Sequence, residues 1–212
     1  DILVDDLELE DQWILSRLAT VTKQVTEALD HFRYADATRI LYDFSWDEFC
    51  SFYIEIIKVR LNDNRHGPLA RRILAHTLDT IIRLLHPMIP FITEEVWQRL
   101  AELAPKRGLK PTQAAESVMV AEWPKAEDAH LNKVIETRFS YFQKVLAGVR
   151  EIRSRQQIAP RKQVSFSVRC DSQVADSLAA MKPYFESMAA ALVTELGPEV
   201  SAPAFSATTN SG

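Results

Sequence analysis

Apolar residues recur three and four positions apart along much of the chain, which is the spacing of one face of an α-helix. The first such stripe runs from about Leu9 to Phe32 and includes Ile14 and Leu18. Asp11 stands near its start as a candidate cap for the helix N-terminus. We therefore expect a long amphipathic helix in the first part of the chain.

A second helical run begins near Ala35 or Asp36 and is apolar on more than one face, which is typical of a helix that lies between neighbours. Residues 45–48 have the form of a capping box, so this run either bends or restarts there or passes straight through. Its aromatic side chains could stack on unpaired bases, but packing in a core is the favoured interpretation. These side chains are Phe44, Trp46, Phe49, Phe52 and Tyr53.

Residues 62–68 combine asparagine, aspartate, glycine and proline and form the clearest loop of the chain. The helix after this loop should stop at His86, because Pro87 disfavours helical backbone at the residue before it. An apolar connector then leads to Thr93, which has the form of a helix start because carboxylates follow it.

Helical periodicity fades from about residue 104 to residue 129, where prolines interrupt the pattern and residues 118–120 are candidates for an extended segment. A fifth long helix is expected from about His130 to Gln156. Apolar and polar residues then alternate over residues 164–168, which is the period of a half-buried strand.

The remaining pattern predicts a small α/β unit. A helix over residues 173–190, interrupted near Pro183, and a short strand over residues 192–196 would complete it. The fold class is thus mainly α: an antiparallel helical bundle with its connector over residues 1–129, then a long helix and the α/β unit over residues 130–200. Residues 201–212 are rich in Ser, Ala and Thr and are expected to be a disordered tail.

The formal charge of −4 argues against a protein that coats nucleic acid, yet two segments are locally basic. The first segment contains Lys58, Arg60, Arg65, Arg71 and Arg72. The second segment contains Arg150, Arg153, Arg155, Arg161 and Lys162. Either segment can be an ordinary solvated surface or a phosphate-contacting patch. Asn62 and Asn64 lie beside the first segment, and their amides can read the edges of splayed bases.

Other kinds of site have little support in the sequence. The five glycines stand apart, so no glycine-rich phosphate loop is present, and the histidines are too scattered for a metal site. No catalytic constellation is recognisable. Cys50 and Cys170 are expected to be reduced and mostly buried, as in a cytoplasmic protein. No apolar run is long enough to span a membrane.

Four stretches together resemble the valyl branch of the class I aminoacyl-tRNA synthetases. Residues 11–18 read DQWILSRL, residues 41–50 read LYDFSWDEFC, and residues 85–97 read LHPMIPFITEEVW. The fourth stretch is VREIR at residues 149–153, leading to Ile-Ala-Pro at residues 158–160. The resemblance covers about residues 7–200 in order and spacing.

This resemblance implies an anticodon-binding helical bundle followed by the start of a C-terminal domain, with the loop of residues 61–66 at the anticodon end. It implies tRNA for valine as partner, contacted by the basic residues above with Asn62 and Asn64, and the catalytic and editing domains of the same polypeptide. The family's His-x-Gly-His and Lys-Met-Ser-Lys-Ser motifs are absent here. We therefore expect no cofactor in this segment, whereas the full-length enzyme would use ATP with Mg.

The chain starts at Asp1 without a methionine, which favours an excised segment, and the bundle's usual first helix is expected to lie before residue 1. Such a segment is predicted to be inactive in aminoacylation by itself. The alternative interpretation is a helical protein-interaction module that kept the bundle and lost RNA binding.

Overall fold

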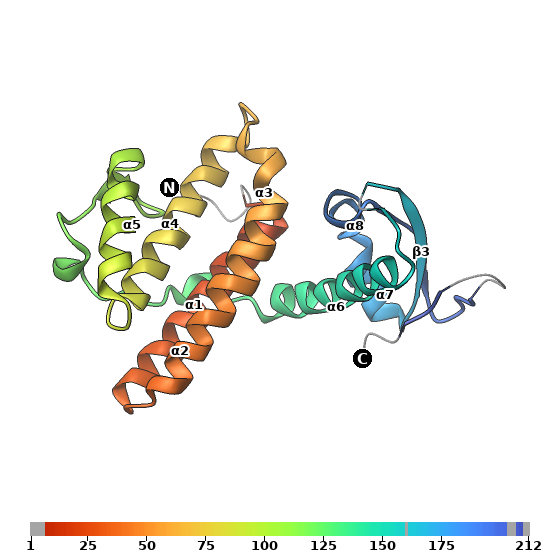
Figure 1. Cartoon of the computed structure of the whole chain (residues 1–212), viewed down its shortest axis with the longest axis horizontal. Helices are drawn as coiled ribbons and strands as arrows, with labels where there is room; N and C mark the ends of the chain where they lie inside the picture. Colours follow the sequence, from red (N-terminus) through yellow and green to blue (C-terminus); the bar gives the residue numbers. More distant parts are fainter. Residues whose placement is uncertain (1–6, 160, 203–206, 210–212) are drawn as a thin grey trace. The chain divides into compact units, whose positions relative to one another are not determined.

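The computed structural model describes residues 7–159, 161–202 and 207–209 (Figure 1). It divides into two compact units, Asp1–Lys133 and Val134–Gly212, and each unit is described by itself. The first unit is a helical bundle, and the second combines helices with a small sheet. The expected class, mainly α with a helical bundle followed by an α/β unit, is confirmed.

The first helix, α1, spans Leu9–Asp30, as the apolar stripe predicts. The expectation that Asp11 caps this helix is wrong, because Glu8 occupies the cap position and Asp11 lies inside the first turn, fully buried. A buried carboxylate needs a partner of opposite charge or several donors. Asp11 therefore serves a contact with another helix, described below, and does not cap its own.

The second helical run passes straight through the capping-box residues. It consists of α2 (Tyr34–Tyr42), the π-helix η2 (Asp43–Tyr53) and α3 (Ile54–Leu61), joined without a break. Glu48 does not form a capping box here. Its carboxylate accepts two hydrogen bonds from Arg17 of α1, at 2.7 and 2.8 Å, so it ties η2 to the first helix.

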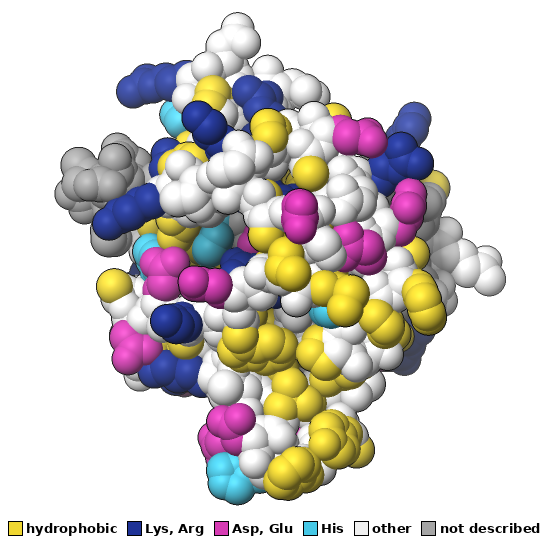
Figure 2. All heavy atoms as spheres, turned by 90° about the vertical axis from the view of Figure 1, so that its left-hand side faces the viewer, with side chains coloured by type: hydrophobic (Ala, Val, Ile, Leu, Met, Phe, Trp, Pro, Cys, Tyr) yellow, Lys and Arg dark blue, Asp and Glu magenta, His cyan; other side chains and the backbone are white. Residues whose placement is uncertain are grey.

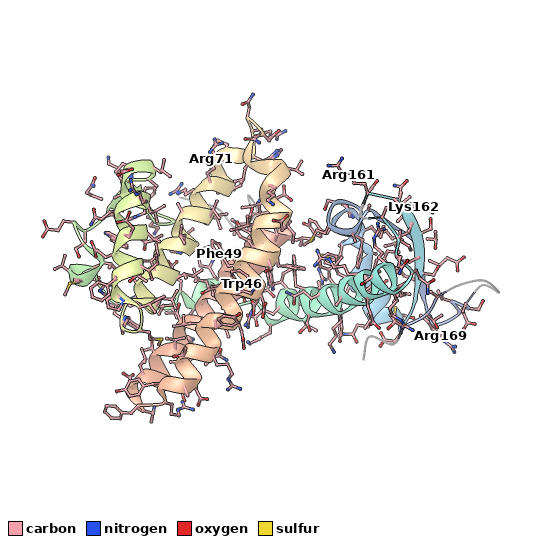
Figure 3. The ribbon with its side chains drawn as sticks, viewed as in Figure 1. Trp46, Phe49, Arg71, Arg161, Lys162 and Arg169 are labelled. Carbon is pink, nitrogen blue, oxygen red and sulfur yellow. The ribbon has the colours of Figure 1, made fainter. Side chains whose placement is uncertain are left out.

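Most of the aromatic side chains of η2 pack in the core, as expected. Phe44, Phe49, Phe52 and Tyr53 are buried, and the ring of Phe52 meets that of Trp13 edge-on at 5.4 Å. Trp46 departs from the expectation, because 58% of it is exposed (Figure 3). Cys50 on the same π-helix is also exposed, which contradicts the expected burial, while Cys170 is half-buried.

Two further helices complete the bundle. Helix α4 spans Gly67–Leu85, so its predicted end at His86 is confirmed, and α5 spans Pro90–Leu103. Thr93 does not start α5, because the helix begins at Pro90, whose fixed φ and missing N–H suit a first helical position. The Thr93 hydroxyl instead donates to the carbonyl of Ile89 at 2.9 Å, within the first turn.

The connector after α5 packs on the bundle. It contains a short antiparallel pair, β1 (Lys106–Arg107) with β2 (Thr112–Gln113), and the 3₁₀ turns η3 (Val118–Val120) and η4 (Asp128–His130). The expected extended conformation of residues 118–120 is therefore wrong. The turn buries Val118 among Ile82, Trp97 and Leu100, while Met119 and Val120 stay exposed.

The second unit contains α6 (Lys133–Arg155), β3 (Val164–Arg169), α7 (Ser172–Ala179), α8 (Lys182–Ala189) and β4 (Ala191–Gly197). Strands β3 and β4 pair in parallel, and the half-buried alternation of β3 and the helix interruption near Pro183 are confirmed. The buried rings of Phe142 and Phe185 pack together in its core, with 4.5 Å between their centroids. Of the expected disordered tail, residues 203–206 and 210–212 lie outside the described residues.

Candidate nucleic-acid interface

The loop of residues 62–66 joins α3 to α4 and lies at one end of the bundle, opposite the turn between α1 and α2 (Figure 1). Asp63 organises this loop. Its Oδ1 accepts hydrogen bonds from the backbone N–H groups of His66 at 2.6 Å and Arg65 at 2.8 Å. The backbone N–H of His66, followed by that of Arg65, lowers the pKa of the Asp63 carboxyl. Asp63 thus folds the loop as an aspartate turn.

The two ends of the loop meet closely. A Cβ on Gly67 would lie 2.8 Å from the carbonyl oxygen of Leu61, which is closer than side-chain carbons approach other atoms. Arg71 donates to the same Leu61 carbonyl at 2.6 Å and so satisfies a carbonyl at the end of α3. Arg71 is itself exposed and lies at the loop end of the bundle (Figure 3).

The side chains that this loop presents to solvent are Asn62, Asn64 and Arg65. None of the three has a side-chain hydrogen-bond partner among the described residues. Two amides offer donors and acceptors, and one guanidinium offers a fork of donors that fits a phosphate. An ordered backbone with unengaged polar side chains suits contact with an RNA loop, because loops expose base edges.

The other basic residues near the loop have different surroundings. Lys58 is exposed and pairs with Glu55 on its own helix, which leaves its ammonium at the surface. Arg72 donates to the carbonyls of Gly108 and Leu109, so it fastens the connector to α4. The hydrogen bonds of Arg72 therefore give it a structural role.

Arg60 is held in the interior, where its guanidinium meets the Asp11 carboxylate in two hydrogen bonds of 2.6 and 2.7 Å. The Glu10 carboxylate lies 3.3 Å away, and the Tyr53 hydroxyl donates to Asp11 at 3.0 Å. Burial lowers the pKa of Arg60, but the hydrogen bonds and charges of Asp11 and Glu10 outweigh it and raise the pKa overall. This residue therefore joins α3 to α1, and its guanidinium is not free for a phosphate.

The second basic segment lies in the C-terminal unit, and one of its members is also internal. Arg153 is buried and donates to the carbonyls of Ala159 at 2.6 Å and Lys162 at 2.9 Å. It thereby holds the turn after α6 in place. Lys162 and its neighbour Arg161 are exposed on that turn (Figure 3).

The two remaining members of this segment lie on the surface of α6. Arg155 pairs with Glu151 one turn earlier, at 3.4 Å. Arg150 reaches the carbonyl of Met188 at 3.4 Å, which is a long hydrogen bond. Both cations keep exposed surface, and exposed pairs of this kind are weak.

Sequence reasoning did not foresee the pairing of Arg60 with Asp11. A signal was present, since Asp11 falls on the same apolar stripe as Ile14 and Leu18, where a carboxylate requires a partner. The sequence did not indicate which arginine would supply that partner.

Two further classes of function find no support in the described part of the chain. Among residues 7–159, 161–202 and 207–209, no three His, Cys, Asp or Glu side chains gather closely enough to hold a metal ion. None of the helices placed there has the length and apolar character that crossing a membrane requires.

The sequence of this chain is similar to those of known proteins. The family described as the anticodon-binding domain of tRNA ligase matches residues 11–168. The chain belongs to this family. Similar curated proteins are valine–tRNA ligases, including that of Rhodopirellula baltica, which is 46% identical over 94% of this chain and 19% of its own length.

Two other relatives show the same relation. The valine–tRNA ligase of Mycolicibacterium paratuberculosis is 40% identical over 76% of this chain and 17% of its own length. That of Laribacter hongkongensis is 36% identical over 91% of this chain and 20% of its own length. The chain thus spans about a fifth of the length of the curated relatives it matches. The resemblance to valyl synthetases that the motifs indicated is confirmed.

Proposed function

We propose that this chain binds the anticodon loop of the tRNA for valine and contributes anticodon discrimination to a valine–tRNA ligase. The loop of residues 62–66 carries this proposal, because its backbone is ordered by Asp63 while Asn62, Asn64 and Arg65 remain unengaged by the described residues. Membership of the anticodon-binding family supports tRNA as the partner. The names of the relatives support valine as the amino acid.

The surroundings of each basic residue divide the first segment by role. Arg65, Arg71 and Lys58 would hold phosphates of the anticodon loop, since their charged groups lie at the surface. Asn62 and Asn64 would meet base edges. Arg60 and Arg72 act through the fold, as their hydrogen bonds tie α3 to α1 and the connector to α4.

The second basic segment would contact the tRNA outside the anticodon. Arg150, Arg155 and Lys162, with Arg161, present cations on the C-terminal unit, and phosphate contacts of this kind position RNA without reading its sequence. Arg153 would act indirectly, since it holds the turn that carries Lys162.

The full polypeptide would work in the cytoplasm and join valine to its tRNA with ATP and Mg, using catalytic and editing domains that this chain does not contain.

Fluorescence titration of the chain with the valine tRNA and with an anticodon-substituted copy tests the proposal. We expect tighter binding of the valine tRNA, and Asn62→Ala with Asn64→Ala should remove the preference. Equal binding of both tRNAs by the unaltered chain, or none, would favour the protein-interaction module.

A further inference from the structure

A second candidate site lies in the first unit, between α4, α5 and the connector. It is a cleft of about 820 Å³, large enough for a small organic ligand. It shares no lining residue with the loop of residues 62–66. Charged and polar side chains converge on it from His76, Asp79, Arg83, Arg107, Lys110 and His130. Figure 2 looks onto α5 and the connector and shows basic, acidic and histidine side chains together on that side.

Arg107 is the unusual member of this cleft. Only 2% of its side chain is exposed, and its guanidinium stacks on the ring of Trp97 with 4.0 Å to the ring centroid. Its Nε lies 3.1 Å from Oδ1 of Asp79. Its Nη1 and Nη2 have no hydrogen-bond partner within the described part of the chain. Leaving a charged donor buried without an acceptor is costly, so these nitrogens are suited to an acceptor from outside the protein.

The charges around Arg107 do not balance. Asp79 also pairs with Arg83, whose Nη2 lies 2.6 Å from Oδ2, so two guanidinium groups share one carboxylate. The Nη1 of Arg83 donates to the carbonyl of Glu122 at 3.0 Å, while its Nε lacks a hydrogen-bond partner among the described residues. The other charged lining residues, Lys110, Glu122 and Glu127, are exposed. The interior of the cleft therefore holds an excess positive charge with unused donors.

His76 adds a neutral group to this wall. Burial, then the charges of Arg83 and His130, lowers the pKa of its imidazole to about 4. Near neutral pH the ring can therefore donate and accept one hydrogen bond each. Lys110 and Thr112, from the hairpin, add a cation and a hydroxyl.

We propose that this cleft binds an anion that carries a phosphate group, with Arg83 and Arg107 as its principal partners. The Arg107 fork, whose Nη1 and Nη2 have no partner among the described residues, matches the oxygens of a phosphate in paired hydrogen bonds. Arg83 adds its charge and its Nε, because its Nη groups are engaged by Asp79 and the Glu122 carbonyl, and Asp79 holds both arginines in position. The cleft is large enough for more than a bare ion. The phosphate group could therefore belong to a nucleotide or to an RNA chain.

Trp97 provides a reporter, because its indole N–H donates to the carbonyl of Ala115 at 3.0 Å and its ring carries Arg107. Inorganic phosphate and adenosine monophosphate would be titrated separately into ¹⁵N-labelled chain, with the Trp97 indole resonance assigned through Trp97→Phe. Sodium chloride at matched ionic strength is the control. We expect a saturable shift with at least one phosphate probe and none with chloride.

Variants show whether the arginines are responsible. Arg83→Gln should weaken phosphate binding by about tenfold or more, the effect expected from removing a charge-assisted hydrogen bond. Lys106→Gln is the matched control and should change binding less than about twofold, since Lys106 is exposed beside Arg107 and does not line the cleft. Both variants are checked for folding by circular dichroism, and their indole spectra provide a second check.

Competition with tRNA distinguishes the two sources of phosphate. If tRNA shifts the Trp97 indole resonance as phosphate does, and inorganic phosphate competes with tRNA for this effect, the site binds an RNA phosphate. A shift that tRNA does not cause assigns it to a free phosphate compound. No saturable shift with either phosphate probe, or unaltered affinity in a folded Arg83→Gln chain, overturns the proposal. These outcomes are independent of anticodon discrimination, because the loop and the cleft share no lining residue.

Discussion

Arginines that look alike in the sequence lie in three kinds of surroundings. Arg60 is paired with buried carboxylates, Arg72 donates to backbone carbonyls of the connector, and Arg65 points into solvent from an ordered loop. A guanidinium already engaged by acceptors must leave them before it meets a phosphate, whereas an exposed one gives up only water. Among the proposed phosphate contacts, Arg65 is therefore the one to test first, because its side chain has no acceptor to leave among the described residues.

Arg65→Ala is therefore expected to weaken binding of the valine tRNA and to reduce its salt dependence. Removing one phosphate contact on single-stranded RNA should lower the slope of log affinity against log salt by about 0.7. Binding would be measured at several salt concentrations. Arg99→Ala removes a similarly exposed arginine from α5 and is the control, for which the slope should not change. If the slope of log affinity against log salt is the same in both variants, Arg65 does not contact a phosphate of the tRNA.

His76 makes stability depend on pH. Its pKa is about 4 in the folded chain and 6.5 in an unperturbed histidine, so the unfolded chain binds more protons between these values. The free energy of unfolding is therefore unaffected by this histidine above pH 6.5 and falls as the pH decreases towards 4. The total decrease is on the order of 3 kcal/mol. Urea unfolding at several pH values should show this slope reduced in His76→Gln. Exposed His31→Gln should keep it, and an unchanged slope in His76→Gln would contradict the assignment.

At the scale of elements, the loop between α3 and α4 is held by interactions that leave its tip free. Asp63 fixes the backbone, and the Gly67 backbone lies against the Leu61 carbonyl. The sequence predicted this loop from its turn-forming residues, because such residues act locally. It did not indicate that Arg60 and Arg72 would anchor the neighbouring helices, since their partners are distant along the chain.

Gly67→Ala tests the close approach at the base of the loop. The added Cβ would lie 2.8 Å from the Leu61 carbonyl oxygen, so the loop must shift, and we expect the free energy of unfolding to fall by about 1–3 kcal/mol. Urea denaturation measures it. The Asn64 side chain in the same loop has no hydrogen-bond partner among the described residues, so Asn64→Ala should stay within about 0.5 kcal/mol. Equal stability of Gly67→Ala and the unaltered chain would show that the loop accommodates the added Cβ without loss of stability.

The helical run from α2 to α3 shows a second limit of local reasoning. Residues 45–48 carry a genuine capping-box pattern, yet Arg17 of α1 takes the Glu48 carboxylate and the helix continues. Trp46 is exposed, whereas Phe44, Phe49, Phe52 and Tyr53 of the same helix are buried. Both outcomes depend on which helices become neighbours.

At the scale of the whole molecule, the two units are expected to contribute differently to tRNA binding. The double variant Arg161→Ala with Lys162→Ala, made in the complete chain, should weaken binding of the valine tRNA and of its anticodon-substituted copy equally. The salt slope should fall by about 0.9 for each duplex phosphate that the protein no longer neutralises. A change in the preference between the two tRNAs would show instead that the C-terminal unit takes part in anticodon reading.

The sequence by itself determined the helical periods, the loop, the alternating strand and the family resemblance, because spacing and turn chemistry are local properties of the chain. Tertiary structure alone decided which charges are buried. It paired Arg60 with Asp11, folded residues 118–120 into a 3₁₀ turn, and brought Arg83 and Arg107 to one carboxylate. Burial and long-range pairing depend on residues far apart in sequence, and a charged side chain has the same local pattern whether water or a carboxylate surrounds it.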